Sequence, residues 1–189
     1  MMHVIRVAAL LATATASIFA RSVGPEVYRN EEFGITAPVP EGALLCPTPQ
    51  NEHDHGPLFL LGTRDSKRCQ DVERQRAIDV FASYNAIQAT KTLDKFLRSE
   101  CRNTFKAECR PAPSGLQVNG LPSKAARVSC PDGWIDIFVV TQAGKPAPDF
   151  DASVPSVNYD LSLHTTPGHL KEDLPIFRAV LATIQLSPE

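Results

Sequence analysis

The chain has 189 residues, with 19 lysines and arginines against 21 aspartates and glutamates. This near balance of charge, without a basic cluster, argues against nucleic acid or an anionic membrane surface as the main partner. The length favours one domain that buries a hydrophobic core, and a protein or a small ligand remains as the expected partner.

The first twenty residues have the pattern of a secretory signal. A single Arg6 precedes an apolar, alanine-rich run over 7–20 that ends in small residues, the arrangement that a signal peptidase recognises. The run is shorter than the ~20 apolar residues of a membrane span. We expect cleavage after Ala16 or Ala20, a mature domain over 21–189, and a periplasmic or secreted protein without stable membrane insertion.

Short strands dominate the first half of the predicted domain. Short segments bounded by turn residues, one of them wholly apolar and one clearly alternating, predict four strands, of which the first two form a hairpin. They cover 27–30, 33–38, 58–61 and 77–84. Thr92 then predicts the N-cap of a helix. The apolar face of this helix carries Leu93, Phe96, Leu97 and Cys101.

The pair Asp132-Gly133 predicts the turn of a second hairpin, since both central positions of a two-residue turn need positive φ. This turn sets a register in which one face is wholly apolar. The opposite pairs on that face are Cys130 with Ile135, Val128 with Ile137, and Ala126 with Val139. The strand over 134–141 is largely apolar on both faces, so we expect it to be central and covered on both sides.

The last elements expected are a strand and a helix. Alternation over 157–165 predicts a strand whose apolar face points inward. A helix is predicted from about Asp173 to Leu186, with Asp173 as its cap and Pro175 in its first turn. Together the elements predict an α+β fold, an antiparallel sheet of about five to seven strands with two packing helices, arranged as an α/β/α sandwich.

Three segments resemble the PsbP-type sandwich. They are the opening VYRNEEFGITAPVPEG, the NGLPSKAARVSC that leads into the second hairpin, and the closing YDLSLHTTP…FRAVLATIQL. The resemblance covers most of the mature chain, although Ser123 stands where the PsbP-type pattern prefers alanine. It implies an α/β/α sandwich that often serves as an accessory or binding module, and none of the three segments is a catalytic motif.

Five cysteines follow the predicted signal, which indicates an oxidising compartment and leaves at least one thiol outside intramolecular disulfides. We expect Cys46 to pair with Cys69 around the third predicted strand, and Cys101 with Cys109 at the end of the first helix. Cys130 is then the free thiol. It is either a nucleophile or, as we favour, a small core residue, because its neighbours in the hairpin are apolar.

His53 and His55 form the only histidine cluster. Two imidazoles two residues apart, beside Glu52, could begin a zinc or copper site, and His164 or His169 would have to supply a further imidazole. We favour a polar surface loop without metal, because a lone His-x-His pattern specifies little.

Two carboxylates interrupt apolar strand faces, where burial would raise their pKa. They are Asp79 and Asp136. In the predicted hairpin Arg127 lies diagonally across from Asp136, within reach of an ion pair, and Arg74 and Arg76 lie just upstream of Asp79. We therefore favour a buried Arg127–Asp136 ion pair over an acid–base site.

Sequence motifs for catalysis and cofactor binding are missing: the chain has no G-x-S-x-G, no phosphate-cradling glycine motif and no C-x-x-C. We predict an exported, non-catalytic accessory or binding module that is stabilised by disulfides and needs no cofactor. The alternative is a small hydrolase or metal-dependent enzyme that uses His53 and His55 with a carboxylate.

Overall fold

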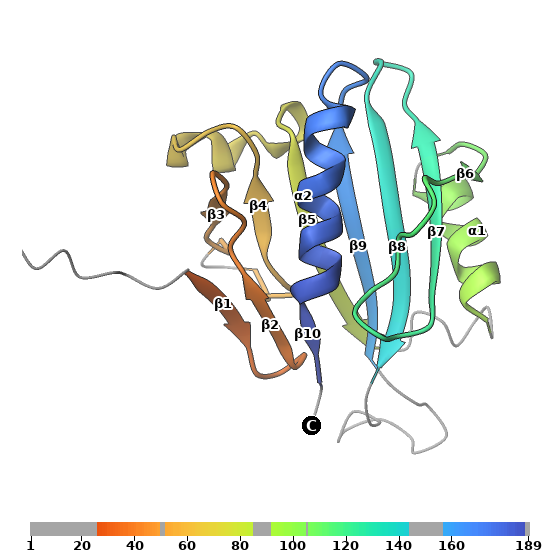
Figure 1. Ribbon diagram of the computed structural model, residues 1–189, viewed down its shortest axis with the longest axis horizontal. Coiled ribbons are helices and arrows are strands. Elements are labelled where there is room, and N and C mark those ends of the chain that lie inside the picture. Colours follow the sequence, from red (N-terminus) through yellow and green to blue (C-terminus); the bar gives the residue numbers. More distant parts are fainter. Residues whose placement is uncertain (1–25, 50–51, 85–91, 105, 144–156, 188–189) are drawn as a thin grey trace, which may run out of the picture.

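The computed structural model describes residues 26–49, 52–84, 92–104, 106–143 and 157–187. The predicted signal over 1–20, with both of its cleavage sites, lies outside the described residues. Two antiparallel sheets and two α-helices make up the described part of the fold (Figure 1). No helix in this part is long and apolar enough to cross a membrane.

The larger sheet has seven strands in the order β3-β4-β5-β9-β8-β7-β6, and the smaller has three in the order β1-β2-β10. The strands of the larger sheet are β3 (Leu44–Cys46), β4 (Leu58–Leu60), β5 (Ala77–Tyr84), β6 (Arg110–Pro111), β7 (Ser123–Ser129), β8 (Ile135–Ala143) and β9 (Val157–Thr165). Those of the smaller sheet are β1 (Val27–Asn30), β2 (Ile35–Pro38) and β10 (Gln185–Leu186). The helices are η1 (Ser66–Gln70), η2 (Val72–Arg74), α1 (Leu93–Asn103) and α2 (Leu170–Thr183). This architecture confirms the predicted α+β class.

Two cores cover opposite faces of the larger sheet. The main core joins the inward residues of β5 and β9 to α2, and its members include Ile78, Val80, Tyr159, Leu161, Leu163, Phe177 and Leu181. The second core lies under α1 and contains Phe96, Leu97, Cys101, Ala126, Val128, Phe138 and Val140. Because β8 contributes to both cores, it is buried on both faces, as its sequence predicts.

The hairpin of β7 and β8 closes one residue away from the predicted register. Val128 lies opposite Asp136, where Ile137 was expected, and Ser129 lies opposite Ile135. A shift of one residue moves every side chain of a strand to the other face relative to its partner. Both faces of β8 are buried, so the apolar pattern of this strand suits either register and could not select between them.

The turn itself explains the observed register. In a two-residue turn at Asp132-Gly133, Pro131 would pair with Trp134, but proline has no N–H to donate to the ladder. The structure instead has Cys130 donating its N–H to the carbonyl of Trp134 at 2.9 Å, across a loop of three residues. Gly133 ends this loop with φ +90°, the left-handed position that such loops require.

The second helix begins before Asp173 and ends before Leu186, so both of its predicted boundaries are wrong. Asp173 is not the cap but a buried residue of the first turn, where its carboxylate binds Arg76 at 3.0 Å and accepts a hydrogen bond from Thr165. Pro175 consequently lies inside the helix. The predicted last turn forms β10 instead, because it pairs with β2.

Candidate functional site

Two disulfides join the pairs that the sequence analysis expects. Cys46 of β3 is bonded to Cys69 of η1, and Cys101 of α1 is bonded to Cys109, which precedes β6. Strands β3 and β6 are the two edges of the larger sheet, so each disulfide holds one edge to a neighbouring helix. Cys130 is the free cysteine, and it is partly buried.

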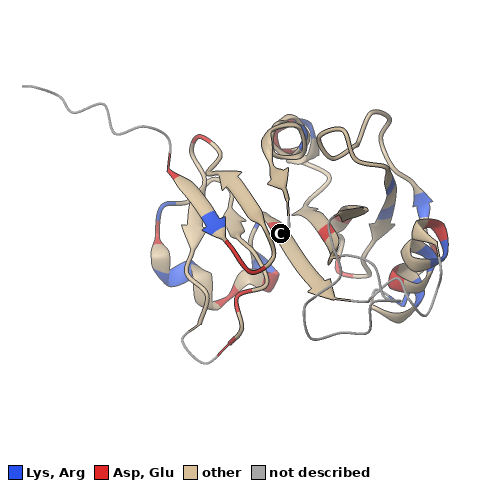
Figure 2. Ribbon diagram, turned by 90° about the horizontal axis from the view of Figure 1, so that it is seen from below, with Lys and Arg blue, Asp and Glu red and all other residues tan. Residues whose placement is uncertain are grey.

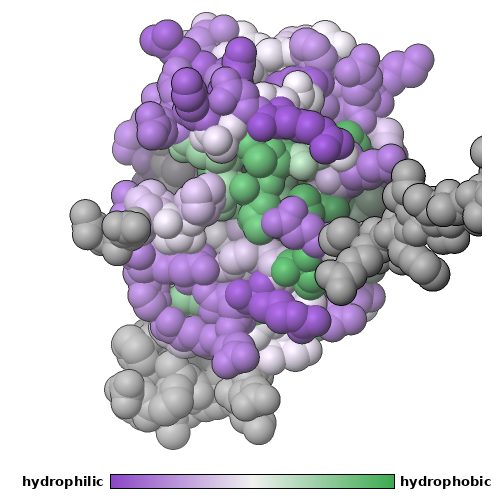
Figure 3. Space-filling model, turned by 90° about the vertical axis from the view of Figure 1, so that its left-hand side faces the viewer, coloured by the Kyte–Doolittle hydropathy of each residue, from purple (hydrophilic) through white to green (hydrophobic). Residues whose placement is uncertain are grey.

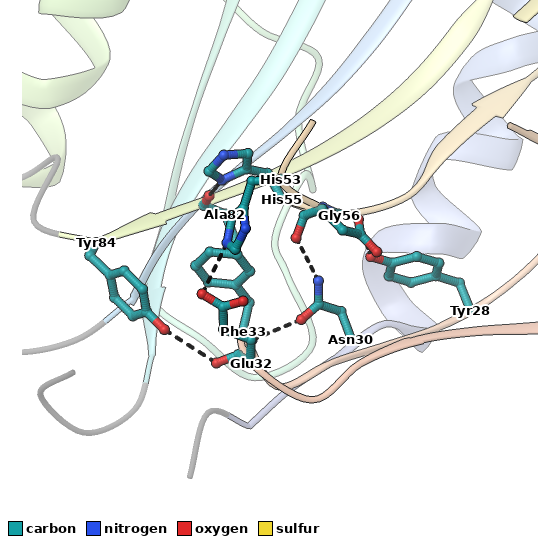
Figure 4. Close-up of polar contacts among 10 residues, drawn as sticks. Tyr28, Asn30, Glu32, Phe33, His53, His55, Gly56, Ala82 and Tyr84 are labelled. Atoms are coloured by element: carbon teal, nitrogen blue, oxygen red, sulfur yellow. Dashed lines mark hydrogen bonds and ion pairs between the residues drawn. The ribbon is translucent and has the colours of Figure 1, made fainter. Parts of the chain in front are cut away.

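The predicted histidine cluster packs against the turn of the β1–β2 hairpin (Figure 4). The Nε2 atom of His53 lies 3.0 Å from the Oε1 atom of Glu32, and the Tyr84 hydroxyl donates to the Glu32 carbonyl at 3.4 Å. The Nδ1 atom of His55 lies 2.9 Å from the Ala82 carbonyl. Because a carbonyl oxygen can only accept a hydrogen bond, Nδ1 of His55 is the donor in this contact.

Asp54, between the two histidines, fixes the loop in place. Its Oδ1 atom accepts hydrogen bonds from the Tyr28 hydroxyl at 2.7 Å and from the Gly56 N–H at 3.1 Å, while its carbonyl accepts from Asn30. Burial and this hydrogen bond raise the pKa of Tyr28, so the hydroxyl stays a donor. Gly56 has φ +147°, and a Cβ at this position would overlap the carbonyl of Val80. The loop therefore has little freedom to rearrange.

An aromatic stack runs from this hairpin to the surface. The ring of His55 lies between Phe33, at 5.6 Å and 26°, and Phe81, at 4.6 Å and 24°. Phe81 is 45% exposed, although it lies within a strand of the larger sheet. A cavity of about 270 Å³ opens beside the stack. Its walls include both imidazoles, the Cys46–Cys69 disulfide, Leu58, Val72 and Phe81.

The two histidines that were expected to complete a metal site, His164 and His169, do not lie at this cavity. His164 is bound by Asp136 on β8, and His169 lies 2.9 Å from the Thr166 hydroxyl at the start of α2. Among the described residues, no group of three or more histidine, cysteine or acidic side chains has a geometry that could hold a metal ion.

A second polar cluster surrounds the free thiol. The Cys130 thiol donates to the Oδ2 atom of Asp136 at 2.9 Å, and the Oδ1 atom of Asp136 lies 2.7 Å from Nδ1 of His164. The Nε2 atom of His164 lies 3.3 Å from the Glu73 carbonyl. The Trp134 indole stacks on the imidazole at 4.3 Å and 8°. Sequence analysis did not connect His164 or Trp134 to Asp136, since only the observed strand register places them together.

The order of this cluster does not suit nucleophilic catalysis. The carboxylate lies between the thiol and the imidazole, and both nitrogens of His164 have other partners, so His164 has no nitrogen free to accept the thiol proton. Burial and then the hydrogen bond to Asp136 raise the pKa of Cys130 to about 12. Burial alone would lower the pKa of His164, but the hydrogen bond and charge of Asp136 outweigh it and raise this pKa. The cluster therefore holds a neutral thiol.

The predicted ion pair between Arg127 and Asp136 does not form. Asp136 faces the second core beneath α1, whereas Arg127 lies opposite Ile137, whose side chain belongs to the main core on the other face. The one-residue difference in register is the cause. Asp136 has His164 as its ion-pair partner instead.

A pair of half-buried carboxyls does occur, on β5 and β9. Asp160 lies opposite Phe81, and Asp79 is two residues earlier on β5, so the three share one face. Burial raises the pKa of Asp79 to about 6. Burial, followed by the charges of Glu100 and Asp79, raises that of Asp160 to about 7. Asp160 was missed because alternation along β9 predicts only that it faces away from the main core.

The fold has relatives among known structures. No protein-family model and no curated protein sequence matches the chain. The solution structure of cyanobacterial PsbP (CyanoP) from Synechocystis sp. PCC 6803 aligns with a TM-score of 0.42 at 12% identity, over 87% of this chain and 95% of that one. The crystal structure of LpqN, involved in cell envelope biogenesis of Mycobacterium tuberculosis, aligns with a TM-score of 0.57 at 13% identity, over 82% of this chain and 84% of LpqN. The likeness to LpqN, a PsbP-like protein, confirms the PsbP-type fold.

Proposed function

We propose that this protein is an exported, non-catalytic binding module that captures an apolar or aromatic side chain of a partner protein in the cell envelope. Two disulfides and the structural likeness to a protein of cell envelope biogenesis are consistent with export. The binding surface is the exposed ring of Phe81 together with the neighbouring cavity of about 270 Å³.

The observation that carries the proposal is the exposure of Phe81. An aromatic ring in the middle of a strand is usually buried, whereas this ring is 45% exposed. Its position is held by stacking on His55, which in turn stacks on the buried Phe33. A rigid, partly exposed aromatic platform beside a cavity is typical of a recognition site, because the partner need not order it on binding.

The surroundings of the platform support a protein partner. Figure 3 shows apolar side chains gathered within a hydrophilic surround, on the side of the molecule where β1 and β3 lie. The edge strand β3 contributes Leu44, which is partly exposed and lies on the same sheet face as Phe81. The neutral thiol of Cys130, with its pKa of about 12, supports a role without nucleophilic catalysis.

Site-specific photocrosslinking in the native host tests this proposal. A photoreactive phenylalanine analogue at position 81 should give a discrete covalent adduct, while the same analogue at the exposed Arg98 of α1 should not. The adduct at position 81 should disappear when His55→Ala removes the stacking support. Adducts at both positions, or none at either, would contradict the proposed surface.

The enzyme alternative has one contact in its favour, the 3.0 Å approach of His53 to Glu32 beside His55. A metal-dependent hydrolase built on these residues would bind zinc stoichiometrically and lose its turnover with His53→Ala. We expect neither stoichiometric zinc nor turnover in a broad hydrolase screen of the metal-supplemented protein.

A further inference from the structure

Arg127 is a charged residue whose partner is not supplied by the described part of the chain. Its Nε atom is buried and makes no hydrogen bond there. It also makes no ion pair with a described carboxylate. A buried N–H of a charged group that has no acceptor lowers the stability of the folded protein, so the presence of Arg127 here requires an explanation.

A second guanidinium group lies directly opposite. Arg110 of the edge strand β6 pairs with Arg127 of β7 in antiparallel register, so both side chains project from the same face. Like charges directly opposite each other on neighbouring strands destabilise a sheet. Arg110 is exposed and has no ion-pair partner among the described residues. Two adjacent cations therefore lack a counter-charge at this edge.

The surroundings restrict what can neutralise the pair. The segment after β6 covers the same face, and its Leu116 and Val118 belong to the main core. Arg178 of α2 donates to the carbonyl of Ser114 at 3.0 Å, which adds a third positive charge beside this segment. Figure 2 shows basic positions at the end of the molecule where β6, β7 and α1 lie, with acidic positions of α1 among them.

The acidic residues nearby do not neutralise the two arginines. Asp94 of α1 already pairs with Arg98 at 3.4 Å and with Lys124 at 3.6 Å. Glu108, two residues before Arg110, makes no ion pair with a described residue.

We propose that Arg110 and Arg127 bind a dianionic phosphate group, free or as a phosphomonoester. Two facing guanidinium groups match the two charges of such a group. The planar fork of arginine donates two parallel hydrogen bonds to phosphate oxygens. The bound phosphate accepts from the outer nitrogens of the two guanidinium groups and removes the repulsion across the strand pair. This site lies at the opposite end of the molecule from the small sheet and is independent of the Phe81 surface (Figure 1).

Calorimetric titration of the disulfide-bonded protein with inorganic phosphate tests the site, at pH 7.5 and at an ionic strength held constant with chloride. We expect saturable binding of one phosphate. Arg127→Gln and Arg110→Gln should each weaken it by about tenfold or more, the factor typical of a lost charge-assisted hydrogen bond. Arg110 is exposed, so Arg110→Gln keeps the test valid if Arg127→Gln does not fold.

Arg29→Gln on β1 is the matched control, because it removes the same charge from an exposed site in the small sheet. The phosphate affinity of Arg29→Gln should stay within about twofold of the wild-type affinity, a much smaller change than the tenfold loss expected for a lost contact. Titration with glycerol 3-phosphate shows whether the natural ligand is free phosphate or a phosphomonoester. Tighter binding than that of inorganic phosphate indicates a phosphorylated molecule, and equal binding indicates free phosphate. The proposal is overturned if phosphate does not saturate the wild type below about 10 mM, or if the three variants bind alike.

Discussion

Asp160 lies on β9 with its Oδ1 atom buried and without a hydrogen-bond partner among the described residues. Its carboxyl group shares a sheet face with Asp79 and is also under the influence of Glu100 of α1. Burial penalises the ionised form and the two neighbouring acids repel it, so the pKa rises from 3.8 to about 7. The protonated carboxyl is therefore the form that suits the folded protein.

Replacement of Asp160 by asparagine should stabilise the protein in a pH-dependent way. Because the folded-state pKa is raised, the favourable contribution of the protonated group is complete below about pH 4 and is lost as the pH rises through 7. Asp160→Asn should therefore raise the free energy of unfolding by about 2 kcal/mol at pH 8 and change it little at pH 4. Urea denaturation at both pH values measures this difference.

Asp71→Asn is the matched control, since Asp71 is exposed and its side chain makes no capping hydrogen bond. It should have the same small effect at both pH values. An equal effect of Asp160→Asn at pH 4 and pH 8 would contradict the raised pKa of Asp160.

At the scale of elements, the loop before β4 depends on the backbone of Gly56. This residue has φ +147°, a conformation that L side chains rarely adopt, and it lies directly against the carbonyl of Val80 on β5. The hydrogen bond from its N–H to Asp54 belongs to the network that holds the loop on the β1–β2 hairpin.

Gly56→Ala should therefore destabilise the protein by about 3 kcal/mol, because strain at a special φ and overlap with a backbone atom add together. Gly168→Ala is the matched control, since Gly168 has no positive φ and its added Cβ would lie 4.0 Å from the nearest atom. We expect this control to stay within about 0.5 kcal/mol of the wild type in thermal denaturation. Similar losses for both variants would show that the close approach at Gly56 is absent.

At the scale of the whole molecule, the two disulfides and the predicted signal make one joint prediction. The exported protein should begin at Ser17 or Arg21, after the cleavage expected following Ala16 or Ala20. It should contain one labelled thiol, at Cys130, before reduction and five after it. Intact-mass measurement with thiol labelling checks the start, the label count and the loss of four hydrogens. Five labelled thiols without reduction would contradict export into an oxidising compartment.

Much of the local structure could be predicted from the sequence because the signals are local. The bounds of β5 and β9 follow from alternation, and Thr92 caps α1 through a hydrogen bond to the N–H of Lys95. Strands β3, β6 and β10 were not predicted, since two or three residues are too few to show a period. The equally short β4 was predicted only because its residues form an uninterrupted apolar run. The part of the site around His53 and His55 was found, but its aromatic platform was not, because Phe33 and Phe81 come from separate strand regions.

Local residue patterns were sufficient to predict the α+β class, most of the longer elements and the cysteine pairs, and they showed no catalytic motif. Which groups meet across the sheet depends on strand pairing, which those patterns did not specify. Pro131 cannot donate to the ladder, so the β7–β8 register moves by one residue. That step brings Cys130 to Asp136 and turns Arg127 away from it. The pairing of β8 with β9 places His164 opposite Asp136, and the pairing of β6 with β7 places Arg110 opposite Arg127. Since both faces of β8 are buried, its hydrophobic pattern carries no information about this choice.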